Sequence, residues 1–237
     1  MRIAFYFVLL ASLALLSGGA YGQRGRVLFI EDFDNLENWE HFLFPQVDEH
    51  TSYKLESDGD LTYLKAESKR SASALMHKQE FNPREYPRLK WRWMVGNVYE
   101  KGGAGEKGGD DFPLRVYVTF QFDPKKAGFF ERIKYGIAKR RFGRYPPKSA
   151  LCYVWASRPQ GEEIMKSPYF ENAKLVPVEE GEENLGRWKN EEANIIEDYR
   201  KAFGEEPPEK AALAIMNDSD NTGEGSVSYM DFIEVAR

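Results

Sequence analysis

The residues best suited to bind a ligand lie near the C-terminus, in the stretch NDSDNTG at 217–223. Asp218, Asp220 and Asn221 carry oxygen atoms that accept hydrogen bonds from hydroxyl groups or coordinate a hard cation. The same residue types also favour turns, because their side chains bond nearby backbone groups. The stretch therefore predicts either a well-formed turn between two strands or a metal or sugar site.

A second polar set begins at the end of a glycine-rich stretch in the middle of the chain. Asp110 and Asp111 close the segment GNVYEKGGAGEKGGDD at 96–111, whose glycines predict an irregular loop. Sugar sites combine aromatic faces with a few planar polar groups. A Trp inside a strand, however, is more often part of the core. The candidate ligand-binding residues are therefore Asp110, Asp111, Arg115, Tyr117, Trp155, Asp218, Asp220 and Asn221.

The acidic stretch near the C-terminus partly matches the calcium-binding loop of an EF-hand. Asp218, Asp220 and Thr222 alternate and Gly223 stands at the sixth place, but the twelfth place is Tyr229 where that motif needs a bidentate Glu. Calcium would then need oxygens from separate segments. Glu31, Asp32 and Asp231 are the expected ligands of a structural calcium ion if the first and last strands are neighbours. No other cofactor is expected.

Catalysis has a weaker signature than binding. The three histidines, His41, His50 and His77, lack a metal-ligand spacing, and no nucleophile elbow is present. Asp110 or Asp111 paired with Asp220 would suit a glycoside hydrolase or lyase. The sequence favours a protein that binds a glycan or other small polar ligand without acting on it, with the carbohydrate-active enzyme as the alternative.

Alternating apolar residues predict the strands that position these side chains. Residues 88–95 and 114–122 alternate most clearly, and 27–30, 51–53, 61–66, 151–156 and 174–178 are further short strands. An aromatic content of 14% suits a β-rich core. We expect a mainly β fold: a two-sheet antiparallel β-sandwich, with a jelly roll as first choice and one or two inserted helices.

Two segments are predicted to form helices within this sandwich. Asn190 is the expected cap of a helix over 190–203 that ends at Gly204. A basic helical insertion near 125–148 holds nine basic residues and one acidic residue, Glu131. Its apolar positions favour an ordinary helix that covers the sandwich. The alternative is a peripheral envelope protein that contacts an anionic membrane through 125–148.

The N-terminus predicts export. Residues 1–22 combine Arg2, a short apolar run and the small-residue site Ala20-Tyr21-Gly22, as in a cleaved signal peptide. The remaining 23–237 fit a single β-sandwich domain that is periplasmic or secreted. Cys152 is the sole cysteine and lies in an apolar run, so we expect it to be buried. A net charge of −5 argues against nucleic-acid binding.

Six motifs occur in an order that resembles a known bacterial family. They are IEDFDNLENW, YPRLKWRW, DDFPLRVYVTF, ALCYVWAS, EEANIIEDYRKAFGEEPP and IMNDSDNTGEGSVSYMDFI. Together they resemble domain of unknown function 3047, over nearly all of 23–237, and that family implies no mechanism. The chain is also similar to galactose-binding-like jelly rolls, including carbohydrate-binding modules. That likeness implies a structural calcium at Glu31 or Asp32 with Asp231, although Phe232 departs from the usual Asp-Asp pattern.

Overall fold

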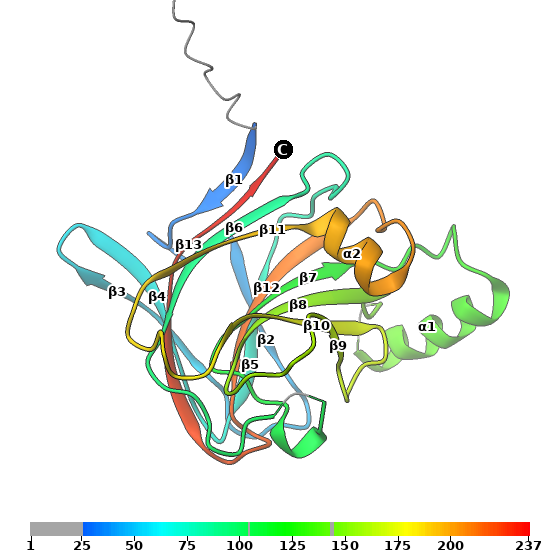
Figure 1. The fold of residues 1–237 in the computed structure, drawn as a ribbon. Coiled ribbons are helices and arrows are strands. Elements are labelled where there is room, and N and C mark those ends of the chain that lie inside the picture. Colours follow the sequence, from blue (N-terminus) through cyan, green and yellow to red (C-terminus); the bar gives the residue numbers. More distant parts are fainter. Residues whose placement is uncertain (1–25, 104, 143–144) are drawn as a thin grey trace, which may run out of the picture.

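Two β-sheets packed face to face make up most of the protein (Figure 1). The computed structural model describes residues 26–103, 105–142 and 145–237; the predicted signal peptide and Arg144 of the basic insertion lie outside them. The six-stranded sheet has the order β11 (Lys189–Asn194), β6 (Arg88–Val95), β13 (Gly225–Ala236), β4 (Leu61–Lys69) and β3 (Ser52–Asp58), with β1 (Val27–Glu31) also paired to β13. The first and last strands are therefore neighbours, which is the condition that the calcium site at Glu31, Asp32 and Asp231 required.

The seven-stranded sheet carries the candidate site. Its order is β2 (Trp39–Leu43), β5 (Ala72–His77), β12 (Ala211–Asp218), β7 (Arg115–Phe120), β8 (Ser149–Ala156), β10 (Ala173–Glu180) and β9 (Met165–Lys166). All pairings are antiparallel except the parallel pair of β8 and β10. The two-sheet β-sandwich of jelly-roll type that the sequence predicts is therefore confirmed, and β2, β5 and β9 are strands of this sheet that it did not indicate.

Aromatic rings join the two sheets in the core. Trp91 and Trp93 on β6 are fully buried, as the alternation of that strand predicts. Trp91 lies 5.3 Å from Tyr153 and Trp93 lies 5.8 Å from Trp155, measured between ring centroids. Because Tyr153 and Trp155 belong to β8, these contacts hold one sheet against the other. The buried position of Cys152, on the opposite face of β8, is also as predicted.

Trp155 is a correction to the predicted binding site. It has no exposed surface, and its Nε1 donates to the Gly181 backbone oxygen at 3.1 Å. The strand alternation turns this side chain inward with Tyr153 and Leu151. Trp155 is therefore a core residue and cannot contact a ligand.

The late helix is shorter than predicted. Residues 189–194 form β11 on the edge of β6, and α2 runs over Ile195–Phe203. Its cap is Asn194 rather than Asn190, since the Asn194 side chain accepts from the backbone nitrogens of Ile196 and Glu197. Tyr199 packs its ring 4.5 Å from that of Phe120, so α2 closes one end of the sandwich.

The basic insertion contains α1, Phe129–Phe142, which projects from the side of the sandwich (Figure 1). The expectation that its apolar face covers the sandwich is wrong: Phe129, Phe130, Ile133 and Ile137 are exposed, and Tyr135 makes the contact instead. Among the described residues, neither helix has the length and apolar character that a membrane crossing requires.

Trp155→Ala should lower the free energy of unfolding by about 3–5 kcal/mol, because it leaves a large cavity between the sheets. Chemical denaturation monitored by circular dichroism measures the change. The control is Trp188→Ala, at a half-exposed position outside the buried core, with a smaller expected loss. Equal stability of wild type and Trp155→Ala would contradict this placement.

Candidate ligand-binding site

Small side chains cover the outer face of the seven-stranded sheet. In the strand register Ala214 pairs with Tyr117, and Tyr117 pairs with Cys152. Their chain neighbours Leu213, Val116 and Leu151 belong to the core, so this row points outward. Ala72, Ala74, Ala150 and Ala212 are further small, buried residues on the same strands. Toward the end of β12 this apolar face gives way to a polar cluster.

Arg115 is the centre of that cluster. Its guanidinium is buried and holds Asp218 with two hydrogen bonds: Nε donates to Oδ1 at 2.8 Å and Nη2 donates to Oδ2. Nη2 also donates to the Asp110 backbone oxygen at 2.6 Å, and Nη1 lies 3.6 Å from Asp110 Oδ2. The guanidinium stacks 4.5 Å from the Phe112 ring centroid. Arg115 thereby fixes the segment before β7 to the end of β12.

Asp111 organises the connection between β12 and β13. Its Oδ2 accepts from the Thr222 backbone nitrogen at 2.6 Å, and its Oδ1 accepts from the Asn221 backbone nitrogen at 3.3 Å and from Asn221 Nδ2 at 2.8 Å. The connection joins strands of different sheets, so no strand ladder supports it. The Asp111 carboxylate supports the connection instead, because it accepts hydrogen bonds from two backbone nitrogens of the loop.

The acidic pair at the end of the glycine-rich stretch is buried rather than solvated. A short helical turn, η1 at Lys107–Gly109, leads into Asp110 and Asp111. A Cβ at Gly109 would lie 2.8 Å from the backbone nitrogen and oxygen of Gly103. Only glycine permits this close approach of the two chain segments. The glycine at this position therefore brings the two carboxylates into the cluster.

The cluster holds more negative than positive charge. Asp110, Asp111, Asp218 and Asp220 face one guanidinium, that of Arg115. Burial raises the pKa of Asp110, Asp218 and Asp220, and the charge of Asp111 raises each pKa further. Arg115 opposes the increase at Asp110 and Asp218. The site therefore favours a ligand that brings hydrogen-bond donors.

Two carboxylates of the cluster differ from the others: one has an unpartnered oxygen and the other is exposed. Asp110 is only 3% exposed, and its Oδ1 has no hydrogen-bond partner within the described part of the chain. A buried acceptor without a donor is costly, so it marks a position for a donor from outside the chain. Asp220, in the connection after β12, is exposed to solvent.

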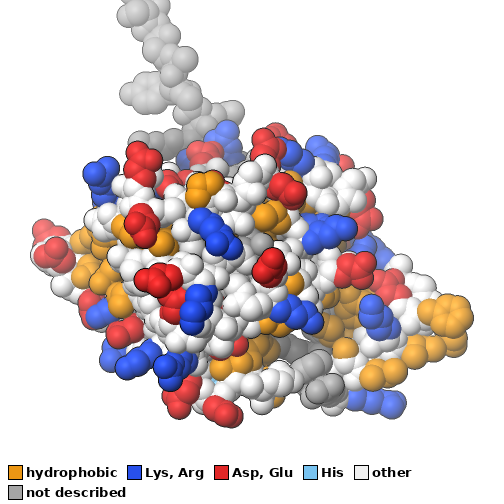
Figure 2. All heavy atoms as spheres, turned by 60° about the horizontal axis from the view of Figure 1, so that its bottom comes forward, with side chains coloured by type: hydrophobic (Ala, Val, Ile, Leu, Met, Phe, Trp, Pro, Cys, Tyr) orange, Lys and Arg blue, Asp and Glu red, His pale blue; other side chains and the backbone are white. Residues whose placement is uncertain are grey.

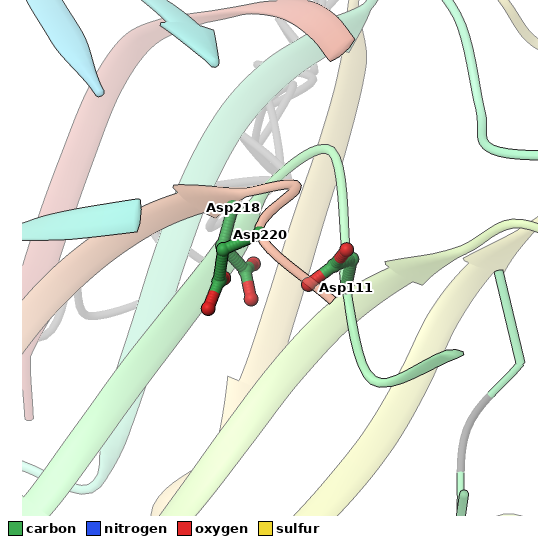
Figure 3. Close-up of side chains that lie close together, drawn as sticks. All are labelled: Asp111, Asp218 and Asp220. Carbon is green, nitrogen blue, oxygen red and sulfur yellow. The ribbon is translucent and has the colours of Figure 1, made fainter. Parts of the chain in front are cut away.

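Within the described ranges, Asp111, Asp218 and Asp220 form the one group of acidic, His or Cys side chains arranged closely enough to hold a metal ion, with oxygens within 4.8 Å of one another. Figure 3 shows Asp218 and Asp220 projecting from the end of β12 and its loop, with Asp111 across from them. Asp111 and Asp218 already accept hydrogen bonds from backbone and guanidinium donors. A cation here would compete with the Arg115 guanidinium for Asp218 and with the loop backbone for Asp111, so the chain's own donors already serve two of the three carboxylates.

The predicted calcium ligands at the chain ends are partnered separately. Glu31 accepts from Asn38 Nδ2 at 2.8 Å and Trp39 Nε1 at 3.3 Å, and its Oε1 lies 3.0 Å from His77 Nε2. Asp231 instead accepts from Arg92 Nη1 at 2.8 Å, and Asp32 is exposed. The structure does not bring Glu31, Asp32 and Asp231 together as a group of metal ligands.

Tyr169 is a site residue that the sequence did not indicate. The residue is 56% exposed, and its single hydroxyl hydrogen is directed between two acceptors, the Lys107 backbone oxygen at 3.0 Å and Asn221 Oδ1. Burial of the hydroxyl, followed by the charges of Asp110, Asp220 and Asp111, raises its pKa. It belongs to an irregular segment without periodicity, so only the contact with Asn221 reveals its role.

Tyr117 completes the predicted set on the sheet face. It is half-buried, and its hydroxyl accepts from Arg115 Nη1 at 3.3 Å. Of the predicted ligand residues, the structure thus gathers Asp110, Asp111, Arg115, Tyr117, Asp218, Asp220 and Asn221 around one end of the seven-stranded sheet and places Trp155 elsewhere.

Fold and site together define a jelly-roll β-sandwich with a buried acidic cluster at one end of an outer sheet face. The chain belongs to the family described as "Protein of unknown function (DUF3047)", whose model matches residues 37–234. The predicted family membership is confirmed. A search of curated proteins finds no match.

Several solved structures align with most of this chain at low sequence identity. The family 11 carbohydrate-binding module of the cellulosomal cellulase Lic26A-Cel5E of Clostridium thermocellum is 10% identical, with 90% of this chain and 94% of that chain covered and a TM-score of 0.43. Lectin I-B4 of Griffonia simplicifolia is 9% identical, with coverages of 88% and 98% and a TM-score of 0.38. Endoglucanase 3 of Trichoderma harzianum is 8% identical, with coverages of 88% and 96% and a TM-score of 0.40. Such likenesses concern the fold alone.

Asp110→Asn should make folding stability less dependent on pH. The raised pKa values mean that the folded state binds more protons than the unfolded state, so the free energy of unfolding falls as pH rises above about 4. Removing one of the charges should flatten this slope and stabilise the protein at neutral pH. Urea denaturation across pH measures both effects. Asp58→Asn, at an exposed hairpin position, should keep the wild-type slope; a wild-type slope in Asp110→Asn would refute the charge imbalance.

Proposed function

We propose that this protein binds a glycan at the acidic cluster and the β12–β13 connection, without changing it chemically. The observation that carries the proposal is the exposed ring of Tyr169 beside the unpartnered Oδ1 of Asp110 and the exposed carboxylate of Asp220. An aromatic face next to acceptor groups is the combination that sugar binding requires.

The chemistry of a sugar matches each part of the site. Sugar hydroxyls donate hydrogen bonds, and carboxylates are acceptors with two oxygens each. The apolar face of a sugar ring can lie against Tyr169, whose hydroxyl is fixed by Lys107 and Asn221. Lys107 Nζ lies 5.7 Å from the Tyr169 ring centroid, on an exposed side chain that can move aside.

Binding without turnover is favoured because the cluster's other carboxylates are already engaged. Asp111 bonds the loop backbone and Asp218 bonds Arg115, so neither is available as an acid or base. Asp110 and Asp220 are the remaining pair, and their raised pKa values support glycoside cleavage as the second candidate function.

Tyr169→Ala and Asp220→Asn should each weaken glycan binding by about tenfold, because each removes one contact worth roughly 1–2 kcal/mol. A glycan array identifies the ligand, and isothermal titration calorimetry on the best hit measures the affinity of each variant. Unfolding temperatures confirm that the variants are folded.

Tyr63→Ala is the matched control, since Tyr63 is a half-exposed tyrosine on the six-stranded sheet. It should bind like wild type. Reducing-sugar release, assayed on the same glycans, separates the two candidate functions. If wild type releases reducing sugar and Asp220→Asn does not, the protein is an enzyme and the binding proposal is wrong. If wild type binds no glycan, both candidate functions are refuted.

Export belongs to this proposal, since the N-terminal stretch matches a cleaved signal peptide. Expression of the full chain in a Gram-negative host should yield a periplasmic or secreted protein whose N-terminus is Gln23. Edman sequencing of the purified product gives the cleavage point. Protein that stays in the cytosolic fraction and still begins at Met1 would contradict export.

A further inference from the structure

Helix α1 exposes an apolar stripe to solvent. Phe129, Phe130, Ile133 and Ile137 are 66%, 84%, 47% and 64% exposed, and they account for half of the eight large hydrophobic residues exposed in the described chain. At 3.6 residues per turn, all four fall within an arc of about 100° on the helix. Figure 2 shows hydrophobic side chains gathered along the protrusion at the right, where α1 lies in Figure 1.

The opposite side of α1 attaches the helix to the sandwich. Tyr135 is buried, stacks 3.8 Å from Phe122 with the rings nearly parallel, and donates to the Pro147 backbone oxygen at 3.3 Å. It stands two positions from both Ile133 and Ile137, which places it about 160–200° around the helix from them. The anchoring contact therefore fixes the apolar stripe outward.

Basic side chains flank the stripe on both sides. Arg132 borders it on one side and Lys134 on the other, and Arg140 falls within its arc; all three are exposed. Lys125, Lys126 and Lys139 are exposed as well, and Glu131 is the one acidic residue of the helix. Part of this charge is engaged, since Lys126 pairs with Glu209 at 3.0 Å and Lys139 lies 4.5 Å from the Tyr145 ring.

We infer that α1 docks this protein onto an anionic lipid surface, with the stripe inserted at the headgroup level and the basic residues on lipid phosphates. Basic charge beside exposed apolar residues is the pattern of helices that lie in a membrane interface. A second copy that docked through its own α1 would bring the same positive charges to the contact and be repelled. The β12–β13 connection lies at another part of the sandwich, at the bottom of Figure 1, so docking leaves the acidic cluster open.

Vesicle co-sedimentation of the chain from Gln23 onward tests this inference. Wild type should bind vesicles of phosphatidylglycerol and phosphatidylcholine, bind phosphatidylcholine alone at least about tenfold more weakly, and dissociate at high salt. Phe130→Ser with Ile137→Ser should lower binding by about tenfold or more, and so should Arg132→Gln, Lys134→Gln and Arg140→Gln combined. The control combines Lys54→Gln, Lys78→Gln and Lys166→Gln, three exposed lysines outside the helix, and should bind like wild type.

A fluorescent label distinguishes insertion from loose electrostatic attraction. Phe130→Cys can be labelled selectively because Cys152 is buried. An environment-sensitive dye there should shift to shorter wavelength with anionic vesicles, whereas the same dye at Lys54→Cys should not. Equal binding to neutral and anionic vesicles, unchanged binding of either α1 variant, or a concentration-dependent dimer abolished by Phe130→Ser would overturn the inference.

Discussion

The buried ion pair of Arg115 and Asp218 is the interaction on which the site depends. Both side chains are nearly inaccessible to water, so the cost of removing two charges from solvent has to be offset by their paired hydrogen bonds and by the further bonds that each of them makes inside the protein. The pair connects the segment before β7 to the end of β12. With Asp111 bonded to the β12–β13 connection, it extends the contact between the neighbouring strands β7 and β12 to the loops beyond their ends.

This arrangement explains why the acidic cluster is suited to binding. Asp111 and Asp218, which build the loop, accept hydrogen bonds from the chain itself. In contrast, Asp110 Oδ1 has no donor among the described residues, and Asp220 is exposed. The single guanidinium leaves excess negative charge, and Tyr169 adds an exposed aromatic surface at the same place. A neutral ligand rich in hydroxyl donors satisfies these acceptors without displacing Arg115. A cation or a second basic group would instead compete with Arg115 for the carboxylates.

Sequence patterns predicted the fold where alternation is strong, as in β6 and β7, whose inward residues form the core. They also indicated Asp110, Asp111, Arg115 and Asp218 as candidate ligand residues by their type and their place on strands or adjoining loops, and the structure brings these four together. They did not separate core from surface for Trp155, since both faces of β8 are apolar. The segment 190–194 carries residues suited to a helix start, but pairing with β6 makes it a strand. The place of Tyr169 in the site follows from its contact with Asn221, which no local sequence pattern predicts.

A crystal structure of the protein bound to the oligosaccharide that it prefers would test the central claim most directly. The account predicts a sugar ring against Tyr169, with hydroxyl groups within hydrogen-bond distance of Asp110 Oδ1 and Asp220 and the pair of Arg115 and Asp218 unchanged. A sugar on the six-stranded sheet, or one that leaves Asp110 Oδ1 without a donor, would contradict it.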